Sequence, residues 1–258
     1  MFAICNLSIV PLRAEPSDKS EIVSQVLFGE HFKIVETLEK WVKIHLHYDD
    51  YEGWIDSKQY QEITKEQFEF LSNQPIILNG DLVEYVVDCN HKMLPITLGA
   101  TLNFLQDETI NTSKFEFEGY KITGILPKSH LVTTAMQYLE APYLWGGKTP
   151  FGIDCSGFTQ MVYKLNGYKL LRDASQQATQ GDVLSFIEES EPGDLAFFDN
   201  EEERNTLTVI GAGIVPEKRT TQIKDEEAWG YWKSMGYKVV TEETLREKIR
   251  EAFIGDVE

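Results

Sequence analysis

A glycine-rich loop that runs directly into a helix constrains this chain more than any other part of its sequence. Residues 143–154 contain three glycines and a proline, so they favour an irregular loop over a helix or a regular strand. The segment 158–165 then has the apolar spacing of a buried helix, and Gly167 ends it. The sequence therefore predicts that Asp154 and Cys155 lie at the N-terminus of a helix.

A cysteine at that position is suited to nucleophilic chemistry. The unpaired N–H groups and the positive dipole end of a helix N-terminus stabilise a thiolate, which is the reactive form of cysteine. Asp154 is a favourable N-cap residue, and the small residues Ser156 and Gly157 leave room for a substrate beside the sulfur. Spacing alone fits a buried structural cysteine that caps a core helix equally well.

The rest of the chain divides into blocks with different patterns. Residues 1–60 read as short strands separated by turns, which is typical of a small barrel. Residues 61–73 read as a linker or short acidic helix, and 74–127 as a second β-rich block. From residue 128 the pattern becomes mixed, with a helix expected over 130–139, a strand over 194–198 and an amphipathic helix over 241–253.

Composition excludes several classes of function. The 258 residues carry a formal net charge of -18, which disfavours binding to nucleic acid or to anionic membranes. The three cysteines have wide spacings without a CxxC motif, so neither a metal site nor a disulfide framework is predicted, and Cys5 and Cys89 are expected to be buried. No stretch is apolar enough to span a membrane or to act as a signal peptide. A cytoplasmic protein, or the trimmed form of an exported one, is expected.

The first block resembles the bacterial SH3-like domains that accompany cell-wall enzymes. The resemblance rests on the order of short motifs: Pro11-Leu12-Arg13, Phe28-Gly29-Glu30, Trp41-Val42-Lys43 and Gly53-Trp54-Ile55. Residues 74–127 are interpreted as a second, more diverged SH3-like barrel.

The third block resembles the NlpC/P60 cysteine peptidases. The motifs are Trp145-Gly146-Gly147, Asp154-Cys155-Ser156-Gly157-Phe158, Arg172-Asp173-Ala174-Ser175-Gln176-Gln177 and Gly193-Asp194-Leu195-Ala196-Phe197-Phe198. The resemblance implies an α+β architecture: a papain-like NlpC/P60 domain over 128–258, atypical from about residue 201, behind two small SH3-like β-barrels.

The subgroup that fits best is the γ-D-glutamyl-L-diamino-acid endopeptidases, similar to dipeptidyl-peptidase VI. They cleave murein peptides that carry a free N-terminal L-alanine. The resemblance implies that Cys155 is the nucleophile, that Asp154 and Ser156 help to hold the amino end of the peptide, and that Asp173 and Ser175 line the same pocket. It implies a murein-derived peptide as partner and no cofactor, and it leaves open the oligomeric state and the choice between lysine and diaminopimelate.

One element of the family pattern is missing. The family places a histidine base in a strand that reads roughly His-Val-Gly-Ile, and here Gly211 stands at the corresponding position if Gly213-Ile214 matches that Gly-Ile. All five histidines precede Cys155 in the chain. Because general acid–base help is worth about 10² to 10⁴ in rate, a second reading is a catalytically impaired relative that binds murein peptides.

Overall fold

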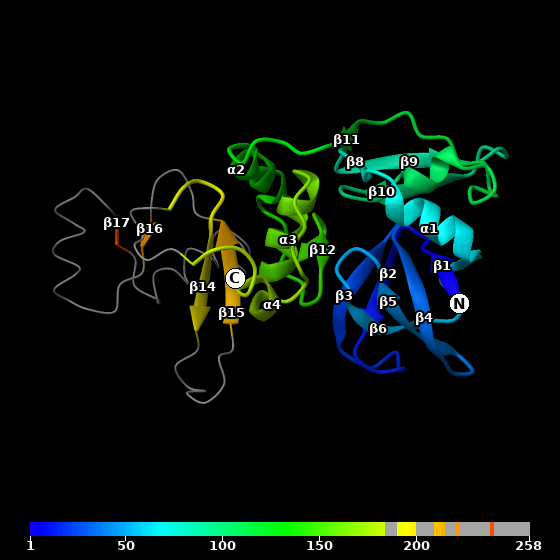
Figure 1. Ribbon diagram of the computed structural model, residues 1–258, viewed down its shortest axis with the longest axis horizontal. Helices are drawn as coiled ribbons and strands as arrows, with labels where there is room; N and C mark the ends of the chain where they lie inside the picture. The colour runs from blue at the N-terminus through cyan, green and yellow to red at the C-terminus, as the bar shows by residue number, and fades with distance from the viewer. Residues whose placement is uncertain (184–189, 200–208, 215–219, 222–237, 240–258) are drawn as a thin grey trace, which may run out of the picture.

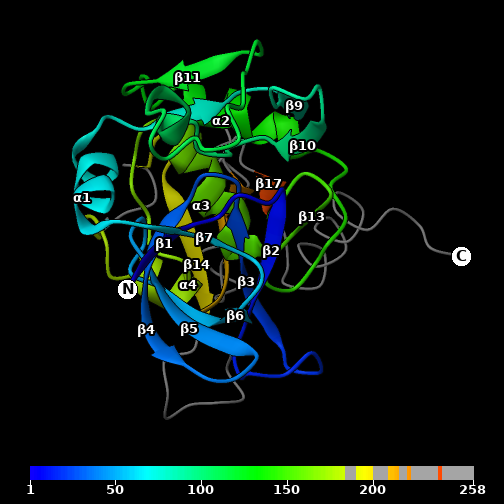
Figure 2. The same ribbon diagram turned by 90° about the vertical axis from the view of Figure 1, so that its right-hand side faces the viewer.

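The computed structural model describes residues 1–183, 190–199, 209–214, 220–221 and 238–239. The helix predicted over 241–253 lies outside these residues. Three units follow one another along the chain: an N-terminal unit (residues 1–63), a middle unit (74–127) and a C-terminal unit from residue 128, with one helix between the first two (Figures 1 and 2). None of the described helices is both long and apolar enough to cross a bilayer.

The N-terminal unit is a seven-stranded antiparallel sheet in the order β3-β2-β6-β5-β4-β1-β7. The strands are β1 (Phe2–Ile4), β2 (Ile9–Arg13), β3 (Ile22–Leu27), β4 (His31–Thr37), β5 (Trp41–Leu46), β6 (Glu52–Asp56) and β7 (Gln61–Ile63). The predicted strands are present, and the sheet also takes in β7, which begins just beyond the predicted boundary at residue 60.

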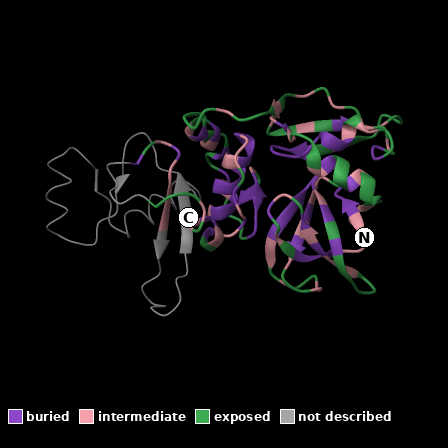
Figure 3. Ribbon diagram, in the orientation of Figure 1, coloured by how far each residue is buried: buried purple, intermediate pink, exposed green. Residues whose placement is uncertain are grey.

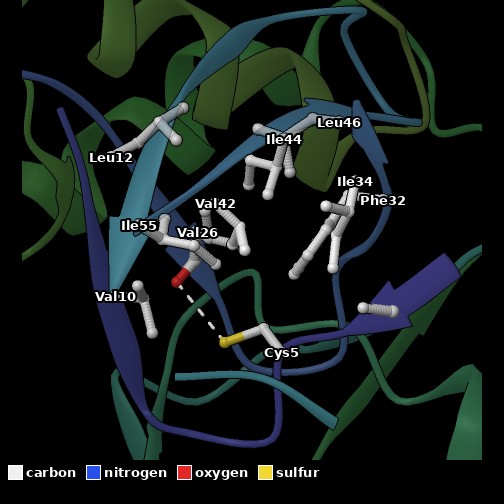
Figure 4. Close-up of a cluster of buried hydrophobic side chains, with 11 residues drawn as sticks. Cys5, Val10, Leu12, Val26, Phe32, Ile34, Val42, Ile44, Leu46 and Ile55 are labelled. Atoms are coloured by element: carbon white, nitrogen blue, oxygen red, sulfur yellow. Dashed lines mark hydrogen bonds between the residues drawn. The ribbon is translucent and has the colours of Figure 1, made fainter. Parts of the chain in front are cut away.

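Alternation along these strands builds one core. In β5 the buried residues Val42, Ile44 and Leu46 alternate with partly exposed ones, as expected for a strand with one face inward. They pack with Val10, Leu12 and other inward residues around Cys5, which is fully buried (Figure 4). The Sγ of Cys5 lies 3.8 Å from the carbonyl oxygen of Val26, so this thiol has a packing role as predicted.

Residues 61–73, predicted as a linker or short helix, contain β7 and then helix α1 (Lys65–Asn73). The helix begins at Thr64, whose hydroxyl accepts from the backbone N–H of Gln67 while the Gln67 side chain accepts from the N–H of Thr64. This capping box explains why the helix starts where it does. Phe68 and Leu71 form its buried face.

The middle unit contains short strands in two ladders. β8 (Ile77–Asn79) pairs with β11 (Lys121–Thr123), and β9 (Val83–Val87) pairs with β10 (Met93–Thr97). Isolated bridges join Leu78 to Thr101 and Val87 to Glu116, and a short 3-10 helix, η1 (Asn103–Gln106), follows β10. The described strands of this unit form separate ladders, so the second SH3-like barrel remains a prediction. Cys89, predicted to be buried, is exposed in the β9–β10 turn, where a short hairpin offers no interior.

The C-terminal unit is built around helix α3 (Cys155–Leu165), which is buried along most of its length (Figure 3). The other elements are α2 (His130–Ala135), η2 (Met136–Tyr138), β12 (Lys148–Thr149), β13 (Gly152–Ile153), α4 (Ala174–Gln177), β14 (Leu195–Asp199), β15 (Val209–Ile214), β16 (Thr220–Thr221) and β17 (Lys238–Val239). β14 pairs antiparallel with β15, and β15 packs against α3. The helix therefore lies between this ladder and the N-terminal unit (Figure 1).

A buried group of charges joins the N-terminal unit to the C-terminal unit. The carboxylate of Glu30 lies 2.6 Å from the Nζ of Lys164 and 3.4 Å from that of Lys148, and all three side chains are 4% exposed or less. Burial alone would raise the pKa of Glu30, but the charges of the two lysines outweigh it and lower that pKa from 4.5 to about 2.

This lowered pKa predicts how stability depends on pH. The folded state binds the Glu30 proton more weakly than the unfolded state does, so the stabilisation is fully present above roughly pH 5 and is lost as the pH falls towards 2. We expect Glu30→Gln to make the urea midpoint less dependent on pH between these values. Glu39→Gln, which removes an exposed carboxylate of the same unit, should keep the wild-type dependence. Equal pH dependence in Glu30→Gln and wild type would contradict this assignment.

Candidate active site

Cys155 is the first residue of α3, as predicted, and its side chain is half-buried. The β12–β13 hairpin leads into it. The close packing of this hairpin explains the glycines: a Cβ at Gly147 would lie 2.3 Å from the carbonyl oxygen of Gly152, and Gly146 has a φ of +76°. The loop can therefore pass close to the start of the helix and present the sulfur at its end.

Asp154 holds the loop and the helix together. Its carboxylate accepts from the backbone N–H of Gly157 at 2.6 Å, which caps α3, and from the backbone N–H of Gly146 at 2.8 Å, which anchors the loop. The same carboxylate forms two bonds with the guanidinium of Arg172, at 2.7 and 3.1 Å. Asp154 is 8% exposed, so these partners account for its buried negative charge.

Arg172 extends the network on both sides. Its Nη1 donates to the hydroxyl of Ser156 at 2.9 Å, and its Nε donates to the hydroxyl of Ser24 in the N-terminal unit at 3.0 Å. The side chain is 1% exposed. Thus Asp154 and Ser156, predicted to hold the amino end of a peptide, both contact this buried guanidinium. Their substrate role remains a prediction, and a role in supporting the loop is evident.

Asp173 and Ser175, the second pair of predicted residues, lie at the start of α4, which packs against the first turns of α3. The amide of Gln177 donates to the carbonyl oxygen of Ser156 at 2.9 Å, and its carbonyl accepts from the hydroxyl of Thr159 at 2.7 Å. Asp173 is half-buried at the start of α4, and Ser175 is exposed in its first turn. The structure thereby brings the segment of Asp173 and Ser175 to the helix of Cys155.

Two residues of the N-terminal unit reach this region without any local signal in the sequence. The phenol of Tyr51 donates to the carboxylate of Asp173 at 3.0 Å, across 122 residues of chain. The indole N–H of Trp145 donates to the carboxylate of Glu21. Burial raises the pKa of the Asp173 carboxyl, and the Tyr51 bond and the Arg172 charge oppose that rise. Only a prediction of how the units dock could have identified Tyr51 and Glu21.

Tyr143 adds a further polar group near the sulfur. Burial raises the pKa of its phenol, and the charges of Cys155 and Asp154 raise it further. The phenol is therefore protonated near neutral pH and carries a hydrogen-bond donor. The sequence reading did not single out Tyr143.

The histidines occupy other parts of the chain. The rings of His31 and His47 stack with centroids 4.7 Å apart beside Phe68 of α1. His45 contacts Asp50 and Glu52, and His91 lies in the β9–β10 turn. His130 begins α2, where the helix predicted over 130–139 starts, and it is exposed. Gly211, the position that resembles the family's histidine, lies in β15 opposite Phe198 of β14.

The Asp154–Arg172 pair predicts a large effect on stability. Arg172→Met would leave the carboxylate of Asp154 buried without its cationic partner, and breaking such a pair costs about 3–5 kcal/mol. Arg13→Met is the matched control, because Arg13 donates one bond to the carbonyl oxygen of Ser20 near the surface and should cost about 1 kcal/mol. Urea unfolding followed by tryptophan fluorescence measures both. A similar small loss in the two variants would argue against the network.

Comparison with known proteins places this geometry in a family. Residues 140–239 match the NlpC/P60 family, and residues 12–59 match the SH3 domain of bacterial dipeptidyl-peptidases. The chain is 26% identical to the γ-D-glutamyl-L-lysine dipeptidyl-peptidase of Bacillus cereus, over 74% of this chain but 64% of that protein, which is just under two thirds of its length. It is 29% identical to dipeptidyl-peptidase 6 of Lysinibacillus sphaericus, over 77% of this chain and 82% of that protein.

A solved structure supports the fold. The crystal structure of an NlpC/P60 family protein from Bacillus cereus superposes with a TM-score of 0.70 at 22% identity, covering 84% of this chain and 88% of that one. The family match extends through β15 to residue 239, so part of the segment predicted to be atypical from about residue 201 falls within the family pattern. The chain thus carries an NlpC/P60 domain preceded by an SH3 domain of the bacterial dipeptidyl-peptidase type.

Proposed function

We propose that this protein is a cysteine peptidase that cleaves the γ-D-glutamyl–diamino acid bond of murein peptides with a free N-terminal L-alanine. The observation that carries the proposal is the position of Cys155: it is the first residue of α3, beside a loop pinned by Asp154, within the segment that matches the family. The name of the relative from Bacillus cereus, a γ-D-glutamyl-L-lysine dipeptidyl-peptidase, supports the class of bond, and that of the relative from Lysinibacillus sphaericus supports a dipeptidyl-peptidase.

The helix end supplies the environment for the nucleophile. The N-terminus of α3 favours the thiolate of Cys155 over the thiol. The sulfur would attack the carbonyl carbon of the D-glutamyl side chain, and the amine of the diamino acid would leave with a proton. Water would then hydrolyse the acyl-enzyme. The protonated phenol of Tyr143 could donate to the oxyanion that forms in each step.

The docked N-terminal unit favours a short peptide with a free amine. Asp173 offers a carboxylate to the ammonium group of L-alanine, and the Tyr51 hydroxyl holds that carboxylate in place. Ser175 is exposed on the same short helix and is available to the peptide. Tyr51 contacts Asp173 and Glu21 contacts Trp145, so these residues of the N-terminal unit would limit the room beyond L-alanine and exclude a peptide extended before it. We also propose that the middle unit is a diverged SH3-like unit.

A second function follows from the missing histidine. With Gly211 at the expected position, the base that takes the thiol proton and returns one to the leaving amine has no assigned residue. A protein that binds murein peptides with little turnover would keep the contacts of Asp173 and Tyr51 and would need no base. This alternative differs from the first in rate and not in ligand.

Cleavage of L-Ala-γ-D-Glu-diaminopimelate and of its lysine counterpart, followed by mass spectrometry, tests the proposal. We expect release of L-Ala-D-Glu that is abolished in Cys155→Ala. Absence of release from a folded protein whose Cys155 the peptide still protects from iodoacetamide would support the binding function. Absence of both release and protection would refute the two functions together.

A histidine placed in β15 tests the assignment of Gly211. If that position corresponds to the family's base, Gly211→His should raise the cleavage rate by roughly 10² or more. Ala212→His is the matched control, since neighbouring residues of a strand face opposite sides. An equal response of the two variants, or of neither in a protein that cleaves slowly, would show that Gly211 is not the position of the base.

A further inference from the structure

The turn between β3 and β4 contacts all three units of the chain. Leu27 packs in the hydrophobic cluster of the C-terminal unit, and Phe28 packs in the cluster of the middle unit. Gly29 approaches so closely that a Cβ there would lie 1.8 Å from the carbonyl oxygen of Thr101. Glu30, the last residue of the turn, is 4% exposed and accepts from the backbone N–H of Leu27 at 2.8 Å. Its carboxylate is therefore held rigidly by its own turn.

The carboxylate of Glu30 is linked through Lys148 to the loop before Cys155. Lys148 contacts the N-terminal unit twice, through its Nζ to Glu30 and through its backbone N–H to the side chain of Gln25 at 2.7 Å. The preceding residue, Gly147, packs against α3 so tightly that a Cβ on Gly157 would lie 2.2 Å from its carbonyl oxygen. A shift of Lys148 would thus be passed to the first turn of α3.

The same carboxylate is linked through Lys164 to α3 itself. Lys164 donates to Glu30 at 2.6 Å, and Gln160, one turn earlier on the same face, donates to the buried carboxylate of Asp49 at 2.8 Å. Glu30 and Asp49 belong to the N-terminal unit, whereas Lys148 and Lys164 belong to the C-terminal unit. Two negative and two positive side chains are buried together, so docking of the units balances their charges.

We propose that Glu30 is a positioning residue for Cys155: by holding Lys148 and Lys164 it fixes both the loop that leads into Cys155 and the helix that begins with it. The N-terminal unit then also sets the reactivity of the cysteine. The inference rests on the proposed function in one respect, because it takes Cys155 as the reactive group.

The test measures the reactivity of the thiol without any peptide. Alkylation of Cys155 by iodoacetamide is followed by intact mass spectrometry from pH 5 to 9 in the full chain carrying Cys89→Ser, which removes the exposed thiol. Cys5 does not interfere, since it is fully buried and burial raises its pKa to about 12. Glu30→Gln and Lys164→Met are compared with Glu39→Gln, and circular dichroism verifies that each is folded.

The two variants separate positioning from simple charge effects. Through the field of the charge alone, losing the negative Glu30 would lower the thiol pKa and losing the positive Lys164 would raise it. Loss of positioning loosens the loop and the first turn of α3 in both cases, so the N–H groups that stabilise the thiolate are held less well around the sulfur. We therefore expect the thiol pKa to rise by about half a unit or more in both variants, with roughly threefold slower alkylation below it, and no change in Glu39→Gln.

Opposite shifts in the two variants, or wild-type profiles in both, would overturn the proposal. If Glu30→Gln does not fold, Glu30→Asp replaces it: it keeps the negative charge and shortens the reach to both lysines, so a raised thiol pKa in this variant reports lost positioning and an unchanged one contradicts the proposal. Lys169→Met, at an exposed lysine nearby, is the control for Lys164→Met. A shift in Lys164→Met that Lys169→Met reproduces would also overturn it. Failure of the proposed function would be seen separately, as absent cleavage and absent peptide protection in the wild type.

Discussion

A single buried carboxylate, that of Glu30, determines how the units of this protein fit together. A charge removed from water is tolerated only when partners replace its hydration, and Glu30 finds them in Lys148, Lys164 and the backbone of its own turn. Both lysines come from the C-terminal unit. The N-terminal unit alone would expose Glu30, and the C-terminal unit alone would expose Lys148 of β12 and Lys164 of α3. Docking is therefore part of how each unit satisfies its own charged residues.

The helix ends and strands that depend on neighbouring residues could be predicted from the sequence. The start of α3 at Cys155 follows from the glycine-rich loop and from Asp154 as a cap, and its end follows from Gly167, which adopts a φ of +83°. The strands of the N-terminal unit follow from alternation. The side-chain partners of Arg172, Glu30 and Tyr51 could not be predicted in this way, because their bonds span from 16 to 148 residues and most depend on how the units dock. Cys89 was predicted wrongly because composition does not report on a hairpin turn.

The buried network also changes how the site residues are read. Asp154 looks from sequence like a cap, or, by resemblance, like a group that meets the substrate. In the structure its two oxygens serve a helix N–H, a loop N–H and a guanidinium. Asp173 is half-buried and accepts from the hydroxyl of Tyr51, so in our proposal its carboxylate is the one offered to a charged amine.

The structural role of Asp154 and Arg172 affects how the missing histidine is interpreted. Asp154 and Arg172 have a structural role, since removing either would leave the other's buried charge without its partner. Their presence therefore does not by itself distinguish catalysis from binding. The exposed Ser175 and the half-exposed phenol of Tyr143 lie outside the hydrogen bonds of Asp154 and Arg172 described above. Whether the site cleaves a peptide or only binds it depends on Cys155 and on the group that takes the proton of its thiol.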